Sequence, residues 1–290
     1  MNAFINAKTN MKKLQFGETK CHKMHVGLTC TNCPDLYVDK WKLENKKNIF
    51  TSVEDLEDIE SGETKLEDVE YERYLGDILS SNGRNKKNIL SRRSKGVGIV
   101  NQILAILEGT CYGPHVFEVG LLFRKSILIN SILTNSETWY GVKNEEIEQL
   151  EQVDEIFLRK LLEVGRGCPK EMLYLETGSL PIRFIIMSRR LMFLHYLLNE
   201  ENDSLVHKVL QEQIRSPVKN DWILVVQENM EELEIALDLE NIKTLSKDSF
   251  KAFIENKINA KALEYLNKLK SKHSKVMHVV HKKLKLQEYF

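Results

Sequence analysis

The stretch that decides the fold class is Arg73-Tyr74-Leu75-Gly76-Asp77-Ile78-Leu79-Ser80-Ser81-Asn82-Gly83, followed by a basic run from Arg84 to Lys95. Its first part is rich in strand-forming residues, and Asn82-Gly83 is a strong turn signal. The run contains no acid, and its cations are Arg84, Lys86, Lys87, Arg92, Arg93 and Lys95. A strand or hairpin leading into a basic helix is one way to grip a phosphate backbone. An ordinary turn before a solvated helix is the alternative.

From about residue 85 onward, the apolar residues recur at helical spacing. The first such series is Ile89, Val97, Val100, Ile103, Leu104 and Leu107. Asn144 is expected to cap a later helix and Pro181 to open another, and further helices are expected near 203–214, 220–236 and 246–270. The sequence therefore predicts a mainly α fold, in which a short strand or hairpin segment over about residues 12–80 precedes a multi-helix array.

Charge is distributed unevenly along the chain. The formal net charge is zero, yet residues 1–50 carry nine Lys and four acids, whereas residues 51–72 carry ten acids and one Lys. Residues 251–285 carry ten Lys and two Glu. Zero is therefore a cancellation between segments, and local basic faces are expected. The dense carboxylates before residue 72 predict a solvated connector or a short helix, because such groups repel one another and favour exposure.

Composition excludes several classes of protein. No apolar run approaches the roughly 20 residues that a membrane span needs, and Met1-Asn2-Ala3-Phe4 does not begin a secretory signal. The cysteine count of five is odd, which does not suggest a disulfide framework. We therefore expect an intracellular protein of the cytoplasm or nucleus that is not secreted and has no membrane partner.

A zinc site is one reading of a short segment near the N-terminus. Cys21, His25, Cys30 and Cys33 lie within thirteen residues, and thiolates and imidazoles at such spacing can ligate zinc. The pattern is incomplete as a known finger, because no second pair follows at regular spacing. Such a zinc would be closed and structural; incidental strand and loop residues are the alternative.

Seven segments, read in order, resemble the reverse transcriptases of non-LTR (LINE-type) retrotransposons. They are Leu14–Gly27, Tyr74–Gly76, Lys95–Ile103, Arg124–Leu133, Asn135–Tyr140, Leu150–Asp154 and Met172–Arg183. By this resemblance, Leu14–Gly27 is the last palm segment, Tyr74, Leu75 and Gly76 form the primer-grip hairpin, and Lys95–Ile103 begins the thumb.

The resemblance implies four regions and a function. Residues 1–50 would be a palm-end-like segment, residues 51–84 the acidic connector and primer-grip-like hairpin, residues 85–200 a thumb-like helical region, and residues 201–290 a C-terminal helical region with a basic tail. The family is an RNA-directed DNA polymerase, so the implied partner is an RNA–DNA template–primer. Arg84, Lys86, Lys87, Arg92, Arg93 and Lys95 would meet its phosphates. Glycine at 76 would permit close approach of a backbone.

The chain departs from the family in its catalytic part. The family carries an aromatic-Ala-Asp-Asp turn that holds metal ions, and this sequence contains no Asp-Asp pair. Two-metal nucleotidyl transfer needs such carboxylates. We therefore expect a fragment truncated before that motif, with no catalytic residue and no cofactor of its own, and Mg²⁺ only in the complete enzyme. A separate finger–palm portion would be a further partner. A structural relic or a helical protein-interaction module is the alternative.

Overall fold

A computed structural model describes residues 37–41, 61–65, 69–74, 76–110, 115–218, 221–273 and 284. The chain divides into two compact units, Met1–Arg84 and Asn85–Phe290, each considered by itself. The candidate zinc ligands Cys21, His25, Cys30 and Cys33 lie outside the described residues, as do the palm-like segment Leu14–Gly27 and Leu75. Those predictions stay predictions.

Two antiparallel strand pairs are described in the first unit. Strand β1 (Tyr37–Trp41) pairs with β2 (Ser61–Lys65), with Tyr37 opposite Lys65. Strand β3 (Tyr71–Tyr74) pairs with β4 (Asp77–Ser80) as a hairpin, with Tyr74 opposite Asp77. The expected hairpin segment before the helices is therefore present.

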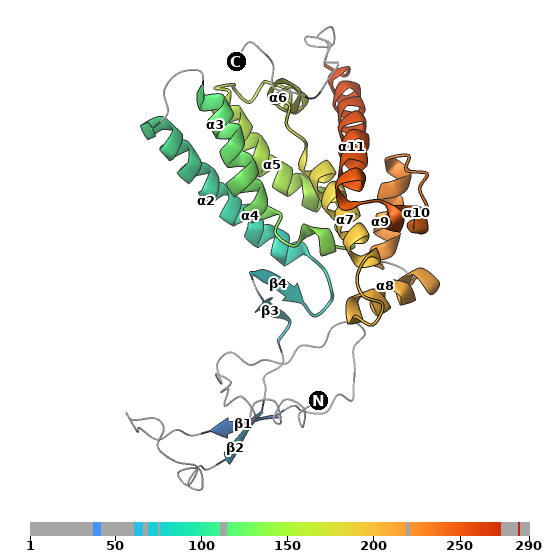
Figure 1. The fold of residues 1–290 in the computed structure, drawn as a ribbon. Coiled ribbons are helices and arrows are strands. Elements are labelled where there is room, and N and C mark those ends of the chain that lie inside the picture. Colours follow the sequence, from blue (N-terminus) through green and yellow to red (C-terminus); the bar gives the residue numbers. More distant parts are fainter. Residues whose placement is uncertain are drawn as a thin grey trace. The chain divides into compact units, whose positions relative to one another are not determined.

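The regular elements described in the second unit are all helices (Figure 1). They are α2 (Lys86–Thr110), α3 (His115–Phe123), the π-helix η3 (Arg124–Ile129), α4 (Asn130–Ile132), the 3₁₀ helix η4 (Ser136–Thr138), α5 (Asn144–Leu161), α6 (Lys170–Thr177), α7 (Ile182–Leu198), α8 (Leu205–Arg215), α9 (Trp222–Glu232), α10 (Leu239–Thr244) and α11 (Lys247–Lys270). The prediction of a mainly α fold is confirmed. The helices expected near 203–214, 220–236 and 246–270 correspond to α8, α9 and α11.

Local chemistry explains several helix boundaries. Pro181 is the N-cap of α7, one residue before the first helical residue, whereas the sequence predicted it within the first turn. The Ser246 hydroxyl accepts from the N–H of Ser249 at the start of α11. The prediction that Asn144 caps α5 is wrong by one residue, because Asn144 is already helical. There the N–H of Lys143 donates to the Glu146 carboxylate at 3.0 Å.

Two hydrophobic clusters meet along α7. One includes Ile89, Leu128 and Phe157, from α2, η3 and α5. The other joins α7, α9 and α11 through residues such as Phe184 and Phe250, both fully buried. Helix α7 contributes to both clusters, and α11 packs against α6 and α7. The regions expected at 85–200 and 201–290 consequently lie in one compact unit. None of the described helices is long and apolar enough to cross a bilayer.

Candidate nucleic-acid interface

The primer-grip-like segment forms the turn of the β3–β4 hairpin. Only Leu75 and Gly76 separate the paired residues Tyr74 and Asp77. Gly76 has φ +89°, a backbone conformation that residues other than glycine rarely adopt. A Cβ at this position would meet no described atom within 4 Å. The turn conformation, rather than close packing, therefore requires glycine. Tyr74 is exposed over 62% of its surface, so its ring is available to a partner.

A second turn ends the hairpin at the residues expected to form it. The Asn82 side-chain oxygen accepts from the Ser80 hydroxyl at 2.7 Å and from the N–H of Arg84 at 2.9 Å. Gly83 has φ +68° and donates its N–H to the Ser80 carbonyl. An Asn side chain that accepts a hydrogen bond from the backbone N–H two residues later stabilises such a turn without a strand partner. The Arg84 side chain is exposed at the end of this unit.

The first turns of α2 carry exposed positive charge. Lys86, Lys87, Arg93 and Lys95 are exposed, and the first turn of this helix contains no acid. Unsatisfied N–H groups give the N-terminus of a helix a positive potential, so a cation there opposes the helix dipole by about 0.3–1 kcal/mol. The arrangement is thus unfavourable for the isolated helix and favourable for a bound anion.

These cations do not form a single stripe. At about 100° per residue, Lys86 and Arg93 lie on one flank of the exposed face of α2, while Lys95 lies on the other. Lys87 lies between these flanks, on the side facing solvent. The acid-free stretch extends from Ile78 to Leu107, so the part of α2 that carries these cations contains no acidic residue. A surface of this kind can attract phosphates without reading a sequence.

Arg92 is a correction to the predicted set of phosphate contacts. Its residue is only 5% exposed, because it shares the buried row of α2 with Ile89 and Gly96. Its Nη1 donates to the Ser131 carbonyl at 3.0 Å, and its guanidinium lies 5.6 Å from the centre of the Trp139 ring. Arg92 therefore holds the helix to the fold and is not placed to meet a phosphate backbone.

Close packing fixes the basic end of α2 on the helical unit. A Cβ at Gly96 would lie 2.8 Å from Cγ2 of Ile132 and 2.9 Å from Cγ1 of Val153. Glycine is thus required where α2 crosses α4 and α5. The Asn85 side chain, just before α2, donates to the Tyr140 carbonyl at 3.0 Å. The exposed lysines consequently project from a supported helix rather than from a loose arm.

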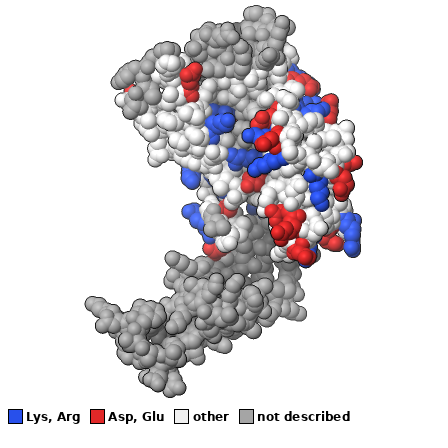
Figure 2. All heavy atoms as spheres, in the orientation of Figure 1, with Lys and Arg blue, Asp and Glu red and all other residues white. Residues whose placement is uncertain are grey.

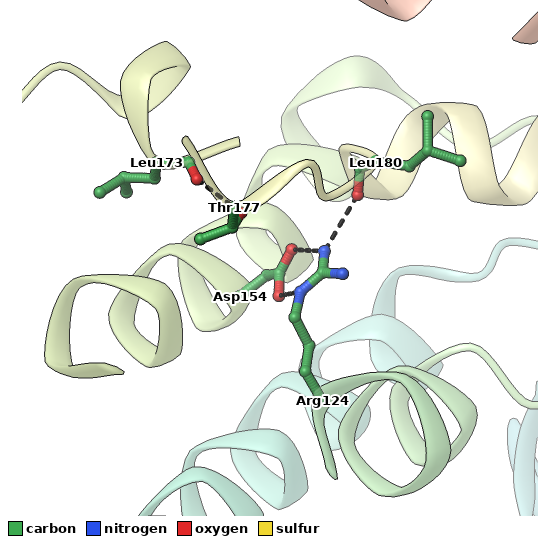
Figure 3. Close-up of polar contacts among 5 residues, drawn as sticks. All are labelled: Arg124, Asp154, Leu173, Thr177 and Leu180. Carbon is green, nitrogen blue, oxygen red and sulfur yellow. Dashed lines mark hydrogen bonds and ion pairs between the residues drawn. The ribbon is translucent and has the colours of Figure 1, made fainter. Parts of the chain in front are cut away.

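Three of the segments that carry the family resemblance meet at one buried arginine (Figure 3). The Nε and Nη2 of Arg124, from η3, donate to the two carboxylate oxygens of Asp154, from α5, at 2.7 and 2.5 Å. Nη2 also donates to the Leu180 carbonyl at 2.9 Å, just before α7. Burial disfavours the charged guanidinium, but the Asp154 charge and hydrogen bonds outweigh it and raise the Arg124 pKa above its ordinary value.

Further polar groups surround that pair inside the protein. Glu151 lies 3.5 Å from Arg183, whose guanidinium in turn lies 5.1 Å from the Tyr265 ring centre. Burial raises the pKa of Tyr174 well above its ordinary value, and the neighbouring Asp154 charge adds to the effect. The set is buried, so it can hold α5, α6 and α7 together but cannot receive a polymer substrate. Sequence reasoning missed it, since its partners lie twenty residues or more apart in the chain.

The face of the helical unit that Figure 2 shows is not uniformly basic. In Figure 2, Lys and Arg side chains are interspersed with Asp and Glu over the visible part of the helical unit. Within the part of the chain that is described, no group of three or more His, Cys, Asp or Glu side chains could hold a metal ion. The exposed cations of α2 are the candidate interface, and their chemistry is electrostatic attraction to phosphates.

Comparison of the chain with protein-family models, with curated proteins and with solved structures finds no match.

Proposed function

We propose that this chain binds the sugar–phosphate backbone of a nucleic acid through the exposed cations of α2, as the template–primer-binding part of a non-LTR-type reverse transcriptase. The observation that carries the proposal is the acid-free start of α2, where Lys86, Lys87, Arg93 and Lys95 are all exposed. Lys86 and Lys87 lie in the first turn of α2, where a cation opposes the helix dipole, so an anionic partner bound there would offset the repulsion.

The proposed binding is sequence-independent and sensitive to salt. Each neutralised phosphate releases condensed counterions, so the logarithm of affinity falls with the logarithm of salt concentration by about 0.9 per contact on duplex DNA. Up to four contacts are available from the exposed cations of α2. The expected affinity is thus modest, and the expected substrate class is a template–primer duplex of RNA and DNA in the cytoplasm or nucleus.

Catalysis is not part of the proposed role of this chain alone. The sequence contains no Asp-Asp pair to hold the two metal ions of nucleotidyl transfer. A finger–palm portion with its Mg²⁺ ions would supply that chemistry in trans or in a longer protein. The corresponding test is template-primer extension by the purified chain, for which incorporation no higher than in a protein-free control is expected.

Salt-dependent binding to a fluorescent RNA–DNA hybrid tests the proposal. Lys86→Gln combined with Lys87→Gln should reduce the slope of log affinity against log salt by about two. The matched control is Lys208→Gln with Arg215→Gln, which removes the same charge from exposed positions of α8 in the same unit. Equal slopes for the two variants would contradict the proposal, as would binding that salt does not change.

A second candidate function is a helical protein-interaction module. Leu205, Val206 and Val209 lie on one side of α8, and 78%, 49% and 50% of their respective surfaces are exposed. Exposed apolar residues that cluster in this way are typical of contact surfaces. Sedimentation of the purified chain over a range of concentrations tests this function; self-association abolished by Val206→Asp would support it.

A further inference from the structure

One serine of the sequence is followed directly by proline. Of the five prolines, Pro217 is the one that follows a residue with a hydroxyl group, Ser216. Lys219, which lies outside the described residues, is the third residue after this serine in the sequence. Protein kinases select their substrates by the residues around the acceptor hydroxyl, charge included. A serine, a proline and a lysine in this order are the pattern that proline-directed kinases select.

The structure exposes this serine at the end of α8. Ser216 is the C-cap of the helix, and its φ of −141° and ψ of 68° are not helical. Its backbone N–H donates to the Glu212 carbonyl at 2.9 Å, which attaches the residue to the last turn. Ser216, Pro217 and Val218 are exposed, and none of the three belongs to a helix or strand. An enzyme can therefore reach the serine while α8 stays folded.

The proline has two effects on this site. Its ring disfavours a helical conformation of the preceding residue, which keeps Ser216 outside α8. Pro217 also has no backbone N–H, so it can enter an apolar pocket of a kinase without leaving a donor unpaired there. Because Pro217 follows the acceptor, the residue that is recognised lies on the side away from the helix.

We propose that Ser216 is the acceptor of a phosphoryl group that a proline-directed protein kinase transfers from ATP. The Ser216 Oγ forms a bond to the γ-phosphorus of ATP, the bond from that phosphorus to the β,γ-bridging oxygen breaks, and ADP leaves with the electron pair. The hydroxyl proton passes to the catalytic aspartate of the kinase. This site is independent of the nucleic-acid interface proposed above.

The added phosphate acts on the last turn of α8. It brings about −1.5 to −2 charges at neutral pH. The carbonyl groups at the end of a helix already carry a negative potential, so the new charge opposes the helix dipole. Arg215 Nε, which lies 3.9 Å from the Glu212 carboxylate, is then shared between two anions that repel each other. Phosphorylation therefore weakens the hydrogen bond from the Ser216 N–H to the Glu212 carbonyl.

Labelling of the full chain by a purified cyclin-dependent kinase with radioactive ATP tests the site. Peptide mass spectrometry should place the phosphate on Ser216, and Ser216→Ala should abolish the labelling. Pro217→Ala keeps the acceptor and should lower the labelling rate roughly tenfold or more, because it removes the residue that is recognised. The matched control is Ser271→Ala, at the exposed C-cap of α11, where Lys272 follows the serine instead of proline. Its labelling should equal that of the unsubstituted chain.

A synthetic peptide of residues 211–221 separates the sequence pattern from its presentation by the fold. The folded chain should be labelled within roughly tenfold of the rate of the peptide, because no helix has to open first. Phosphate found on other residues in place of Ser216, an undiminished rate for Pro217→Ala, or labelling of the peptide without labelling of the chain would overturn the proposal.

Hydrogen exchange measures the effect of the phosphate on α8. The protection of the Ser216 amide, taken relative to the peptide in the same state of phosphorylation, should fall roughly two- to fivefold when the chain is phosphorylated. The Ser271 amide, which donates to the Asn267 carbonyl at 3.0 Å at the end of α11, should keep its protection. Unchanged protection at Ser216 would contradict the weakened last turn.

Discussion

Replacing Arg124 by methionine tests the buried ion pair at the centre of the helical unit. Methionine keeps an unbranched apolar stem but removes the guanidinium. The Asp154 carboxylate, whose side chain is 0% exposed, then loses hydrogen bonds at 2.7 and 2.5 Å, and the Leu180 carbonyl loses its 2.9 Å donor. Removing one partner of a buried pair costs about 3–5 kcal/mol. For a chain of this size, that loss lowers the melting temperature by about 6–20 °C.

The assay is urea unfolding followed by circular dichroism, with Lys208→Met as the control. Lys208 pairs with Asp203 at 3.3 Å, but the two side chains are 59% and 102% exposed, so this change should cost less than about 1 kcal/mol. Arg124→Met combined with Asp154→Leu should recover part of the lost stability, because the second change removes the stranded charge. A loss for Arg124→Met as small as that for Lys208→Met would refute the reasoning.

Three further outcomes follow from individual contacts. Gly96→Ala should destabilise the chain by about 1–3 kcal/mol, whereas Gly98→Ala, with no described atom within 4 Å of its Cβ, should be neutral or stabilising; equal effects in urea unfolding would contradict this packing. Burial raises the pKa of Glu151 above its ordinary 4.5, and the charge of Arg183 opposes this shift. The protonated carboxyl therefore contributes stability that is fully present below pH 4.5 and is lost as the pH rises through the higher pKa of the folded state. Glu151→Gln should therefore gain stability relative to the unsubstituted chain as pH rises from 4 towards neutrality, and a pH-independent difference would exclude this linkage. Burial also raises the pKa of Cys168, so iodoacetamide should label this thiol only above neutral pH. The labelling of Cys168 is the difference between the unsubstituted chain and Cys168→Ser, and rapid labelling at pH 7 would argue against a protonated thiol.

The basic run before and within α2 serves two physical purposes. Arg92 points into the fold and binds neutral acceptors there, whereas Lys86, Lys87, Arg93 and Lys95 remain at the surface. Variants that combine Arg92 with the exposed cations would therefore mix a loss of stability with a loss of binding. Experiments on nucleic-acid affinity should leave Arg92 unchanged.

A sequence signal for the burial of Arg92 existed. The residue follows Ile89 by three positions and precedes Gly96 by four, so it lies in the row that continues to Val100 and Ile103. Helical spacing alone places that row on one face. The prediction of phosphate contacts treated all the cations of α2 as one group. Their positions around the helix axis place Arg92 on the buried face and the other cations on the exposed face. The error at Asn144 was smaller, since helix ends shift by one or two residues with local hydrogen bonding.

By itself, the sequence determined the helices, the hairpin and the exposed charge at the start of α2. These features depend on residues that are close in the chain: a spacing of three or four, a glycine at positive φ, and a stretch without acids. Only the tertiary structure decided which polar residues meet. Arg124 finds Asp154 and Leu180, and Arg190 finds Trp139, across thirty to fifty-six positions. Such pairs form because helix packing buries both partners together, and no local pattern records which helices will pack.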